Sequence, residues 1–281
     1  LATGVGGGIT INTSQKGTAW DGVFRSELNV LSKSGPITWS AKSDADGVSG
    51  GWYGPLAYWG SRAGSLVPTS SSNISLAVDR FDWASGTNPL FGTTGTVEIK
   101  PASDSFAVTV YSSWFSLNQN SQTIGGFTLG KPGSSSLLSI NAAVSANGPI
   151  ALYGGDITLS QYVNLTSTAA GKGILLKAMG NITSNGDQTY TTNGGDITLW
   201  SDSDGSGGGY IYSLDRTKFD SRTNANRTSS LISTASGGGS ITLGGGSVST
   251  TLTSGTVVPT GYALETTSTV PGGVTFGYFN N

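Results

Sequence analysis

The sequence predicts an all-β fold, a right-handed parallel β-helix (β-solenoid), and three observations lead to this prediction. Apolar and polar residues alternate along short segments such as 138–140, 163–165 and 174–176, which is the period of a half-buried strand. Turns rich in Gly, Asn, Asp and Ser separate these segments at a spacing of roughly 20 residues, as in stacked coils. One hexapeptide pattern also recurs. A β-sandwich would share the strands and turns, but it would not need this recurrence.

The composition is typical of a folded chain of strands and turns. Of the 281 residues, 44 are glycine and only 11% are charged, whereas 7 Trp, 10 Tyr and 9 Phe require a packed interior. No apolar stripe of helical period is long enough to predict a helix. Because the chain begins with neither Met nor a signal peptide, we expect it to be part of a longer protein.

Charge and missing residue types exclude several classes of function. With 16 acidic and 14 basic residues, the net charge of −2 offers no broad basic surface, so we expect no nucleic-acid partner. The absence of Cys and His removes Ser-His-Asp and Cys-His catalysis and the usual zinc sites. No apolar run reaches the length of about 18 residues that a membrane span needs, so we expect no membrane insertion.

In chain order, the first strand that we predict precedes an Asp-Gly turn. The segment "PITWSAKSDADGVSGGWY" at 36–53 contains a strand, an Asp-x-Asp-Gly turn, a glycine-rich corner and aromatic residues. The same order of features returns in "DITLWSDSDGSGGGY" at 196–210. The Asp-Gly turn is therefore predicted to be a recurring corner of the fold.

The segment 50–125 is predicted to consist of less regular coils with long loops. It is rich in aromatic residues and prolines, namely Trp52, Tyr53, Tyr58, Trp59, Phe81, Trp83, Phe91, Trp114, Phe115, Pro55, Pro68 and Pro89. We expect these aromatic side chains to pack beneath the loops; the alternative is an aromatic platform that binds sugars.

The segment 126–250 is predicted to form regular coils. "GGDITLSQ" at 154–161 returns as "GGDITLWS" at 194–201 and, more loosely, as "GGSITLGG" at 238–245. These copies are 40 and 44 residues apart, counted between their isoleucines, and further short strands lie between them, so the elementary spacing is about half of that. The whole chain, 1–281, is predicted to be one β-solenoid segment.

Two pairs of aspartates are candidates for calcium binding. Asp44 with Asp46, and Asp202 with Asp204, place hard oxygen ligands beside a glycine turn, which can wrap a Ca²⁺ ion. Neither pair continues into an EF-hand or a nonapeptide calcium array. The alternative is an Asp-Gly turn in which the carboxylate accepts backbone N–H groups.

Two other clusters could support polysaccharide cleavage, which needs carboxylates gathered in one groove. They are Asp79, Arg80 and Asp82 in "VDRFDW", and Asp215, Arg216 and Asp220 in "LDRTKFD". Neighbouring Asp and Arg residues are more often surface ion pairs, so we expect no enzyme activity. Five glycosylation-type sequons are explained equally well by asparagines stacked at turns. They begin at Asn12, Asn73, Asn164, Asn181 and Asn226.

Three segments resemble the repeat regions of filamentous-haemagglutinin-like giant surface proteins of Gram-negative bacteria. They are "TVEIKPASDSF" at 96–106, "GGFTLGKPGSSSLLSINAAVSANGPIALYGGDITL" at 125–159 and "GDITLWSDSDGSGGG" at 195–209. The resemblance covers about residues 90–245 and implies a right-handed β-helical shaft, export across the outer membrane, and a role in adhesion, filaments or extracellular matrix. The amino-terminal secretion domain of that family is missing from this sequence.

These observations together predict a structural and adhesive β-solenoid segment of an exported bacterial cell-surface protein. Uncapped coils have open edges, so we expect end-to-end self-association or continuation into further repeats. Surface glycans are the expected ligands, and calcium is the only cofactor that the sequence suggests. The alternative is a polysaccharide-degrading or glycan-binding β-helix, such as a module of a phage tail fibre.

Overall fold

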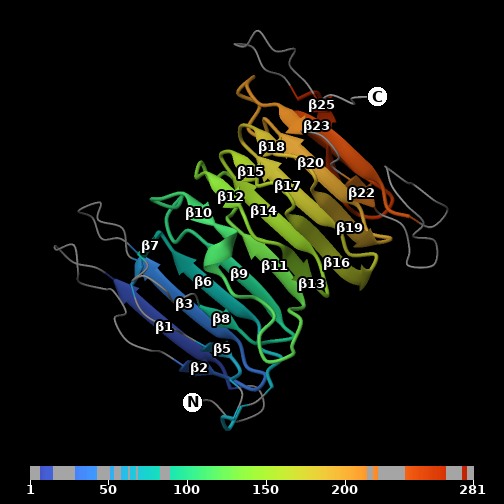
Figure 1. Ribbon diagram of the computed structural model, residues 1–281. Coiled ribbons are helices and arrows are strands. Elements are labelled where there is room, and N and C mark those ends of the chain that lie inside the picture. Colours follow the sequence, from blue (N-terminus) through green and yellow to red (C-terminus); the bar gives the residue numbers. More distant parts are fainter. Residues whose placement is uncertain are drawn as a thin grey trace. The chain divides into compact units, whose positions relative to one another are not determined.

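The computed structural model is all-β and built from parallel sheets, as predicted, and it is compatible with a β-helix (Figure 1). It describes residues 7–14, 29–42, 51–53, 58–62, 64–67, 69–82, 89–213, 218–220, 238–263 and 274–276. The chain divides into two compact units, Leu1–Lys131 and Pro132–Asn281. They are described in turn as the N-terminal unit and the C-terminal unit. None of the described residues forms a helix long and apolar enough to cross a bilayer.

The C-terminal unit contains three sheets that the chain visits in turn. Its strands are β12 (Leu138–Ile140), β13 (Val144–Ala146), β14 (Ile150–Gly154), β15 (Ile157–Leu159), β16 (Asn164–Ala170), β17 (Ile174–Ala178), β18 (Ile182–Ser184), β19 (Thr189–Asn193), β20 (Ile197–Ser201), β21 (Ile211–Ser213), β22 (Lys218–Asp220), β23 (Ile241–Thr251), β24 (Val257–Gly261) and β25 (Val274–Phe276). Sheet 1 has the order β14-β17-β20-β23-β24, sheet 2 β12-β15-β18-β21-β25, and sheet 3 β13-β16-β19-β22. Successive strands from β12 to β22 thus belong to sheets 2, 3 and 1 in rotation.

The register between coils keeps like residues in contact. In sheet 1, Ile150 pairs with Ile174, and Ile174 with Ile197, which are 24 and 23 residues further along the chain. Their side chains and those of the leucines two residues later are almost completely buried, so each successive strand of sheet 1 adds an apolar layer to its inner face. These intervals agree with the predicted spacing of roughly 20 residues.

The two "GGDITL" copies do not stack on each other. Ile157 of the first copy lies in sheet 2, where it pairs with Leu138 and Ile182. Ile197 of the second copy lies in sheet 1, where it pairs with Ile241 of "GGSITL". The interval between the two "GGDITL" copies is therefore not a stacking repeat. The same local solution, a glycine corner followed by a buried strand, is used at two different corners.

The "GGD" corner has a physical explanation in the contact between successive coils. A Cβ atom on Gly195 would lie 2.0 Å from the carbonyl oxygen of Lys172, so only glycine fits there. The next residue, Asp196, accepts a hydrogen bond of 2.6 Å through Oδ1 from the N–H of Ser240 in the following coil. Asp156 accepts from the N–H of Asn181 at the same distance.

Asparagines make the same contact, which accounts for two of the sequons. Asn181 Oδ1 accepts from the N–H of Tyr210 at 3.0 Å, and in the N-terminal unit Asn73 Oδ1 accepts from the N–H of Thr96 at 2.9 Å. These residues all directly precede a strand, and all contact a coil later in the sequence. Neither Asn73 nor Asn181 has another asparagine as its partner, and Asn12 and Asn164 lie within strands, so a stack of asparagines is not what these four positions share.

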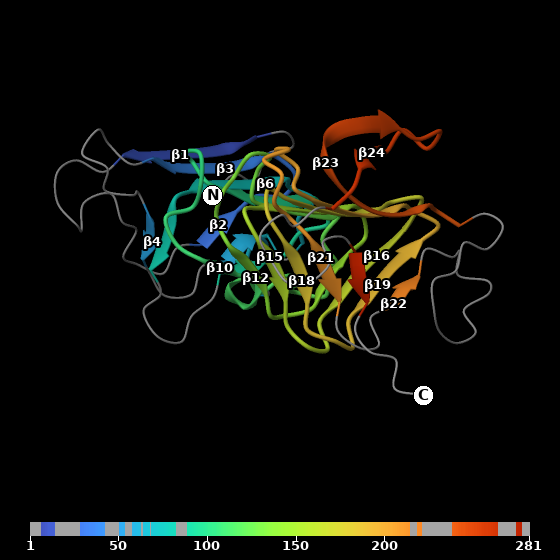
Figure 2. The same cartoon turned by 90° about the horizontal axis from the view of Figure 1, so that it is seen from above.

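One part of the C-terminal unit departs from parallel pairing. Strands β23 and β24 form an antiparallel hairpin, with Thr251 opposite Val257. The hairpin folds back over the outer face of sheet 1 (Figure 2), where Trp200 Nε1 donates a 2.7 Å hydrogen bond to the carbonyl oxygen of Gly246. As a result, all five residues of β20 are buried, not only the inward-facing ones.

The N-terminal unit uses a similar three-sheet order with more uneven intervals. Its elements are β1 (Ile9–Ser14), β2 (Asn29–Leu31), β3 (Ile37–Lys42), β4 (Gly51–Tyr53), β5 (Tyr58–Gly60), β6 (Ile74–Val78), β7 (Arg80–Asp82), β8 (Leu90–Phe91), β9 (Thr96–Lys100), β10 (Val110–Tyr111), the 3₁₀ turn η1 (Ser112–Trp114) and β11 (Gly126–Leu129). The pairing orders are β1-β3-β6-β9-β11, β2-β5-β8 and β4-β7. Ile37 pairs with Ile74, 37 residues later, whereas Ile74 pairs with Val97, 23 residues later.

Most described aromatic residues of this unit are packed inside. Trp59 and Phe91 are fully buried, and Trp59 stacks on Trp39 with ring centroids 6.1 Å apart. Phe81 contacts Phe115 edge to face at 5.4 Å. The expectation that aromatic side chains pack beneath the loops is confirmed for these residues. The side chains of Trp52, Tyr53, Tyr58 and Trp83 lie outside the described part.

Candidate functional site

The described aspartates of the predicted calcium pairs form a hydrogen-bonded turn. Asp202 follows β20 with a φ of 47°, and its Oδ1 accepts from the N–H of Gly207 at 3.1 Å. Asp204 Oδ1 accepts from the N–H of Ser206 at 3.2 Å. Within the described ranges no group of three or more Asp, Glu, His or Cys residues could hold a metal ion. Asp44 and Asp46 lie outside the described residues, and calcium binding stays a prediction.

The first candidate catalytic cluster is not brought together as a groove. Asp79 is 1% exposed, and its Oδ1 accepts hydrogen bonds from the N–H and the hydroxyl of Ser103 at 2.7 and 2.8 Å. Arg80, in contrast, is exposed. Asp79 therefore fastens the loop around Ser103 to the corner after β6, and its buried position keeps it away from a polymer on the surface. The side chain of Asp82 lies outside the described part.

The second candidate cluster is mostly beyond what the structure describes. Asp215 and Arg216 are outside the described residues, and Asp220 is described only as a backbone position at the end of β22. The structure therefore places none of these three side chains.

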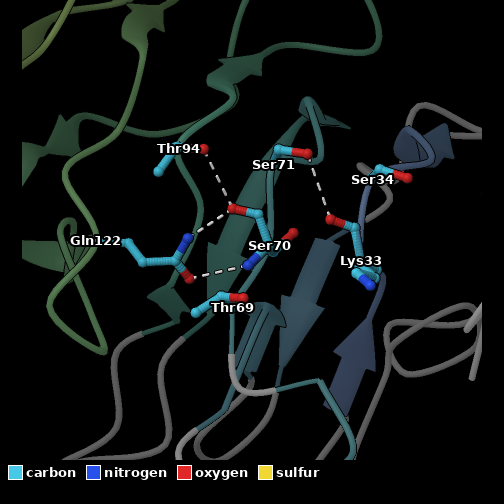
Figure 3. A pocket seen from close by; sticks show the side chains of 7 residues that line it. All are labelled: Lys33, Ser34, Thr69, Ser70, Ser71, Thr94 and Gln122. Carbon is cyan, nitrogen blue, oxygen red and sulfur yellow. Dashed lines mark hydrogen bonds between the residues drawn. The ribbon is translucent and has the colours of Figure 1, made fainter. Parts of the chain in front are cut away.

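A polar groove lies at one corner of the N-terminal unit, and we call it the corner groove (Figure 3). It has a volume of about 560 Å³ and is lined by Lys33, Ser34, Thr69, Ser70, Ser71, Thr94 and Gln122. The amide of Gln122 holds this corner: its Oε1 accepts from the N–H of Ser70 at 3.0 Å, and its Nε2 donates to the carbonyl of Ser70 at 2.6 Å. The buried amide is thus occupied in joining two coils.

The corner groove has few groups that could act on a substrate. The carbonyl oxygen of Ser70 also accepts from the N–H of Thr94 at 2.9 Å, and that of Lys33 accepts from the N–H of Ser71 at 2.8 Å. Lys33 is the only titratable residue among those that line the groove. Without a carboxylate or a second base, this arrangement can hold hydroxyl-rich or anionic molecules but lacks an acid–base pair.

A smaller cleft lies on the outer face of sheet 1 in the C-terminal unit, beside the β23–β24 hairpin. This hairpin cleft has a volume of about 220 Å³ and is lined by Pro149, Ile150, Ala151, Gly173, Ile174, Leu175, Asp196, Thr198 and Thr256. Register places Ala151, Leu175 and Thr198 side by side on β14, β17 and β20. The floor of the cleft is therefore a row of outward-facing side chains, and the hairpin turn forms one wall.

Asp196 connects the hairpin turn to this floor. Its Oδ2 accepts from the hydroxyl of Ser254 at 2.5 Å, in addition to the Oδ1 contact with Ser240. Burial by itself raises the pKa of Asp196, but the hydrogen bonds from Ser254, Thr256 and the Ser240 N–H outweigh it, so the pKa lies below the usual value. Asp196 is thus a buried carboxylate held in the charged form by neutral donors.

Thr198 is the unusual residue of the hairpin cleft. It is 1% exposed, and its hydroxyl oxygen is buried with no hydrogen-bond partner in the described part of the chain. A buried hydroxyl without a partner costs about 1–3 kcal/mol, so native proteins rarely keep one without a ligand or water beside it. No motif in the sequence pointed to this residue.

An aromatic and a cationic side chain stack beside the cleft. Lys177 Nζ lies 3.6 Å from the centroid of the Trp200 ring, directly over it. Burial lowers the pKa of Lys177 and raises the pKa of Tyr153, which precedes it in register on the same face. The hairpin thus covers the end of a Tyr153, Lys177 and Trp200 row.

The hairpin was not among the predicted elements, although the sequence contains a signal for it. Two runs with alternating and β-branched residues, 247–252 and 256–260, flank Ser254 and Gly255, and Gly255 has a φ of 84°. The repeat "GGSITL" at 238–243 indicated parallel stacking instead.

Comparison with protein-family models, with curated proteins and with solved structures finds no significant match to this chain. The resemblance to filamentous-haemagglutinin-like proteins therefore stays a prediction from the quoted segments.

Proposed function

We propose that the chain is a structural and adhesive segment of an exported bacterial cell-surface protein, built as a right-handed parallel β-helix. The observation that carries the proposal is the rotation of strands β12 to β22 through three parallel sheets, with like residues in register at 23 to 25 residue intervals in sheets 1 and 3 between Ile150 and Ile197. Such a fold lengthens by adding coils and needs no new core, which suits a shaft.

The interior supports a structural role because it is filled with packed side chains and contains few groups that could take part in a reaction. The inward positions of the C-terminal unit are mostly Ile, Leu, Val and Ala, and the buried Tyr190 hydroxyl lies 2.8 Å from the hydroxyl of Ser184. Among the described residues, the carboxylates Asp79, Asp156, Asp196 and Asp202 each accept hydrogen bonds from neighbouring corners or turns. These hydrogen bonds favour a structural role for the four carboxylates, which hold neighbouring turns together, over a role in catalysis.

Extracellular location, end-to-end association or continuation into further repeats, and contact with surface glycans belong to the same proposal. They rest on the family resemblance of residues 90–245 and on the general tendency of open strand edges to pair. The competing proposal is a polysaccharide lyase or hydrolase on a similar fold.

Electron microscopy of the purified chain, with calcium and with a chelator, tests the proposal. We expect elongated particles or filaments under both conditions. The variant Asp204→Asn, with Asp104→Asn in another exposed turn as its matched control, should leave them unchanged. Assembly that needs both calcium and Asp204 would make the Asp202 turn an ion site. Compact particles under both conditions would contradict the shaft.

An activity screen separates the shaft from the enzyme. Acidic and neutral polysaccharides are incubated with the chain, and new reducing or unsaturated ends are measured. We expect no cleavage. Cleavage that Asp79→Asn abolishes, while the circular dichroism spectrum stays the same, would favour the enzyme.

A further inference from the structure

We propose that the hairpin cleft binds a neutral hexopyranose residue of a glycan, with Thr198 and Asp196 as the polar contacts. The inference deepens the adhesive part of the proposed function and rests on it, because it names the class of ligand that the surface would recognise. Two independent observations carry it: a cavity on the outer face of sheet 1, and a buried hydroxyl without a partner on Thr198, one of the residues that line that cavity.

The size of the cleft limits the ligand to about one ring. Its volume of about 220 Å³ is several times the share of one water molecule, about 30 Å³, and is below the about 300 Å³ at which sites for drug-sized ligands begin. A longer glycan would place one residue in the cleft and its neighbours outside it.

The floor and wall provide two different surfaces. Pro149, Ala151 and Leu175 offer an apolar floor, which suits the C–H face of a pyranose ring. Asp196 and Thr198 are the two lining residues of β20 and its corner that carry side-chain oxygen atoms. A flat molecule with an apolar face and a polar edge matches this arrangement, and a pyranose has both.

The polar pair requires a ligand that both donates and accepts hydrogen bonds. The Asp196 carboxylate can only accept, so a ligand group beside it must donate, whereas the Thr198 hydroxyl has a proton that needs an acceptor. A sugar hydroxyl does both. An alkyl ammonium group has no acceptor for Thr198, and a fully deprotonated anion such as sulfate has no donor for Asp196.

The charge in the cleft selects against acidic sugars. Asp196 is the only titratable group among the lining residues, and its hydrogen bonds keep it charged at neutral pH. The carboxylate of a uronic acid would be repelled at short range. We therefore expect the neutral hexoses to bind more tightly than their uronic acids.

Methyl-detected NMR titration of the full chain tests the proposal. The probes are the methyl β-D-glycosides of glucose, galactose and mannose, with methyl β-D-glucuronide as the charged analogue. We expect the Ala151, Leu175 and Thr198 methyl signals to shift with a Kd of about 1 mM for at least one neutral glycoside, and more weakly with the glucuronide.

Two variants connect binding to the polar pair. Thr198→Val keeps the shape and removes the unpartnered hydroxyl, so the chain should stay folded while affinity falls about fivefold. Thr158→Val, at the same place in the first "GGDITL" copy, is the matched control and should bind normally. Asp196→Asn should lower affinity about tenfold.

The contrary results are specific. No methyl shift with any of the three glycosides, or equal affinity of the Thr198→Val and native chains, would overturn the proposal and leave the cleft as a water site only. Elongated particles in the microscope together with no sugar binding would overturn this inference alone. Compact particles with sugar binding would instead contradict the shaft.

Discussion

The two copies of "GGDITL" have one sequence and two different environments. In the first copy Asp156 is exposed and Thr158 is half-buried, whereas in the second Asp196 is 7% exposed and Thr198 is 1% exposed. The inward residues do not differ, since Ile157, Leu159, Ile197 and Leu199 are all buried. The hexapeptide therefore determines the corner and the core face. What covers its outer face is decided by the β23–β24 hairpin, more than 40 residues later in the chain.

A repeated motif can thus specify local structure without specifying the residues that surround it. Both aspartates accept a backbone N–H of the next coil at 2.6 Å, which is the shared part of the motif. Only Asp196 has a second partner, the hydroxyl of Ser254. Matched substitutions in the two copies should therefore differ only where the hairpin is involved.

The inward leucines should be equally important in both copies. Leu159→Ala and Leu199→Ala each remove a fully packed side chain and leave a cavity, so each should lower the free energy of unfolding by about 2–5 kcal/mol. Urea denaturation of the two variants measures this. A much smaller loss for one of them would mean that its layer of the core is not packed like the other.

The corner glycines should also respond alike. In Gly155→Ala the new Cβ would lie 2.2 Å from the carbonyl oxygen of Ser135, and in Gly195→Ala 2.0 Å from that of Lys172. Because the obstacle is backbone of the adjacent coil, we expect losses near the upper end of the about 1–3 kcal/mol range for overpacking. Gly133→Ala, where no atom lies within 4 Å but φ is 80°, is a control for conformational strain alone. Losses no larger than in that control would contradict the close approach of the coils.

The aspartates should differ. Asp196→Ala removes an acceptor from the Ser240 N–H and the Ser254 hydroxyl in a buried place, so we expect a loss of about 2 kcal/mol. Asp156→Ala removes an exposed acceptor of one N–H, and about 0.5–1 kcal/mol is expected. Thermal unfolding of both variants checks the order. Equal losses would mean that the hairpin contact contributes nothing.

Acid should weaken the contact between Asp196 and the hairpin, and we expect this effect to be smaller than those of the substitutions above. The pKa of Asp196 lies below its usual value in the folded chain, so its contribution is present above the unfolded pKa of about 3.9 and is lost as pH falls through the folded pKa. The fluorescence of Trp200 is obtained as the difference between the native chain and Trp200→Phe. It should change below about pH 4 as the β23–β24 hairpin that covers its ring loosens. Asp196→Asn should remove this transition, and Asp156→Asn should leave it. A transition that persists in Asp196→Asn would assign it to another group.

Some features could be predicted from the sequence because they depend on neighbouring residues. Alternation at 150–154 and 174–178, glycine at the corners and the Asp202 turn all express local chemistry, and they led to the parallel coils. The sheet to which Ile157 or Ile197 belongs depends on how many residues each corner uses, which alternation does not reveal. The recurrence of "GGDITL" therefore suggested that the two strands are equivalent, although they lie in different sheets.

The hairpin cleft could not be predicted for a related reason. Nothing in "GGDITL" distinguishes Thr198 from Thr158, since the difference arises from a segment that folds back from residues 246–261. Likewise, "VDRFDW" gave no sign that Asp79 turns inward to Ser103 while Arg80 remains exposed. Burial of a polar residue is a property of tertiary contacts, and a single sequence contains them only indirectly.

The corner contacts give the stack a polarity. Asn73, Asp156, Asn181 and Asp196 each accept an N–H from a residue later in the chain, never earlier. In each of these contacts the acceptor side chain belongs to the earlier strand and the N–H to the later one. The rows through Asn181 and Asp196 continue to Tyr210 and Ser240, which carry neither a carboxylate nor a carboxamide. The two ends of such a row therefore differ chemically, because its first residue presents a side-chain acceptor and its last residue only donates a backbone N–H.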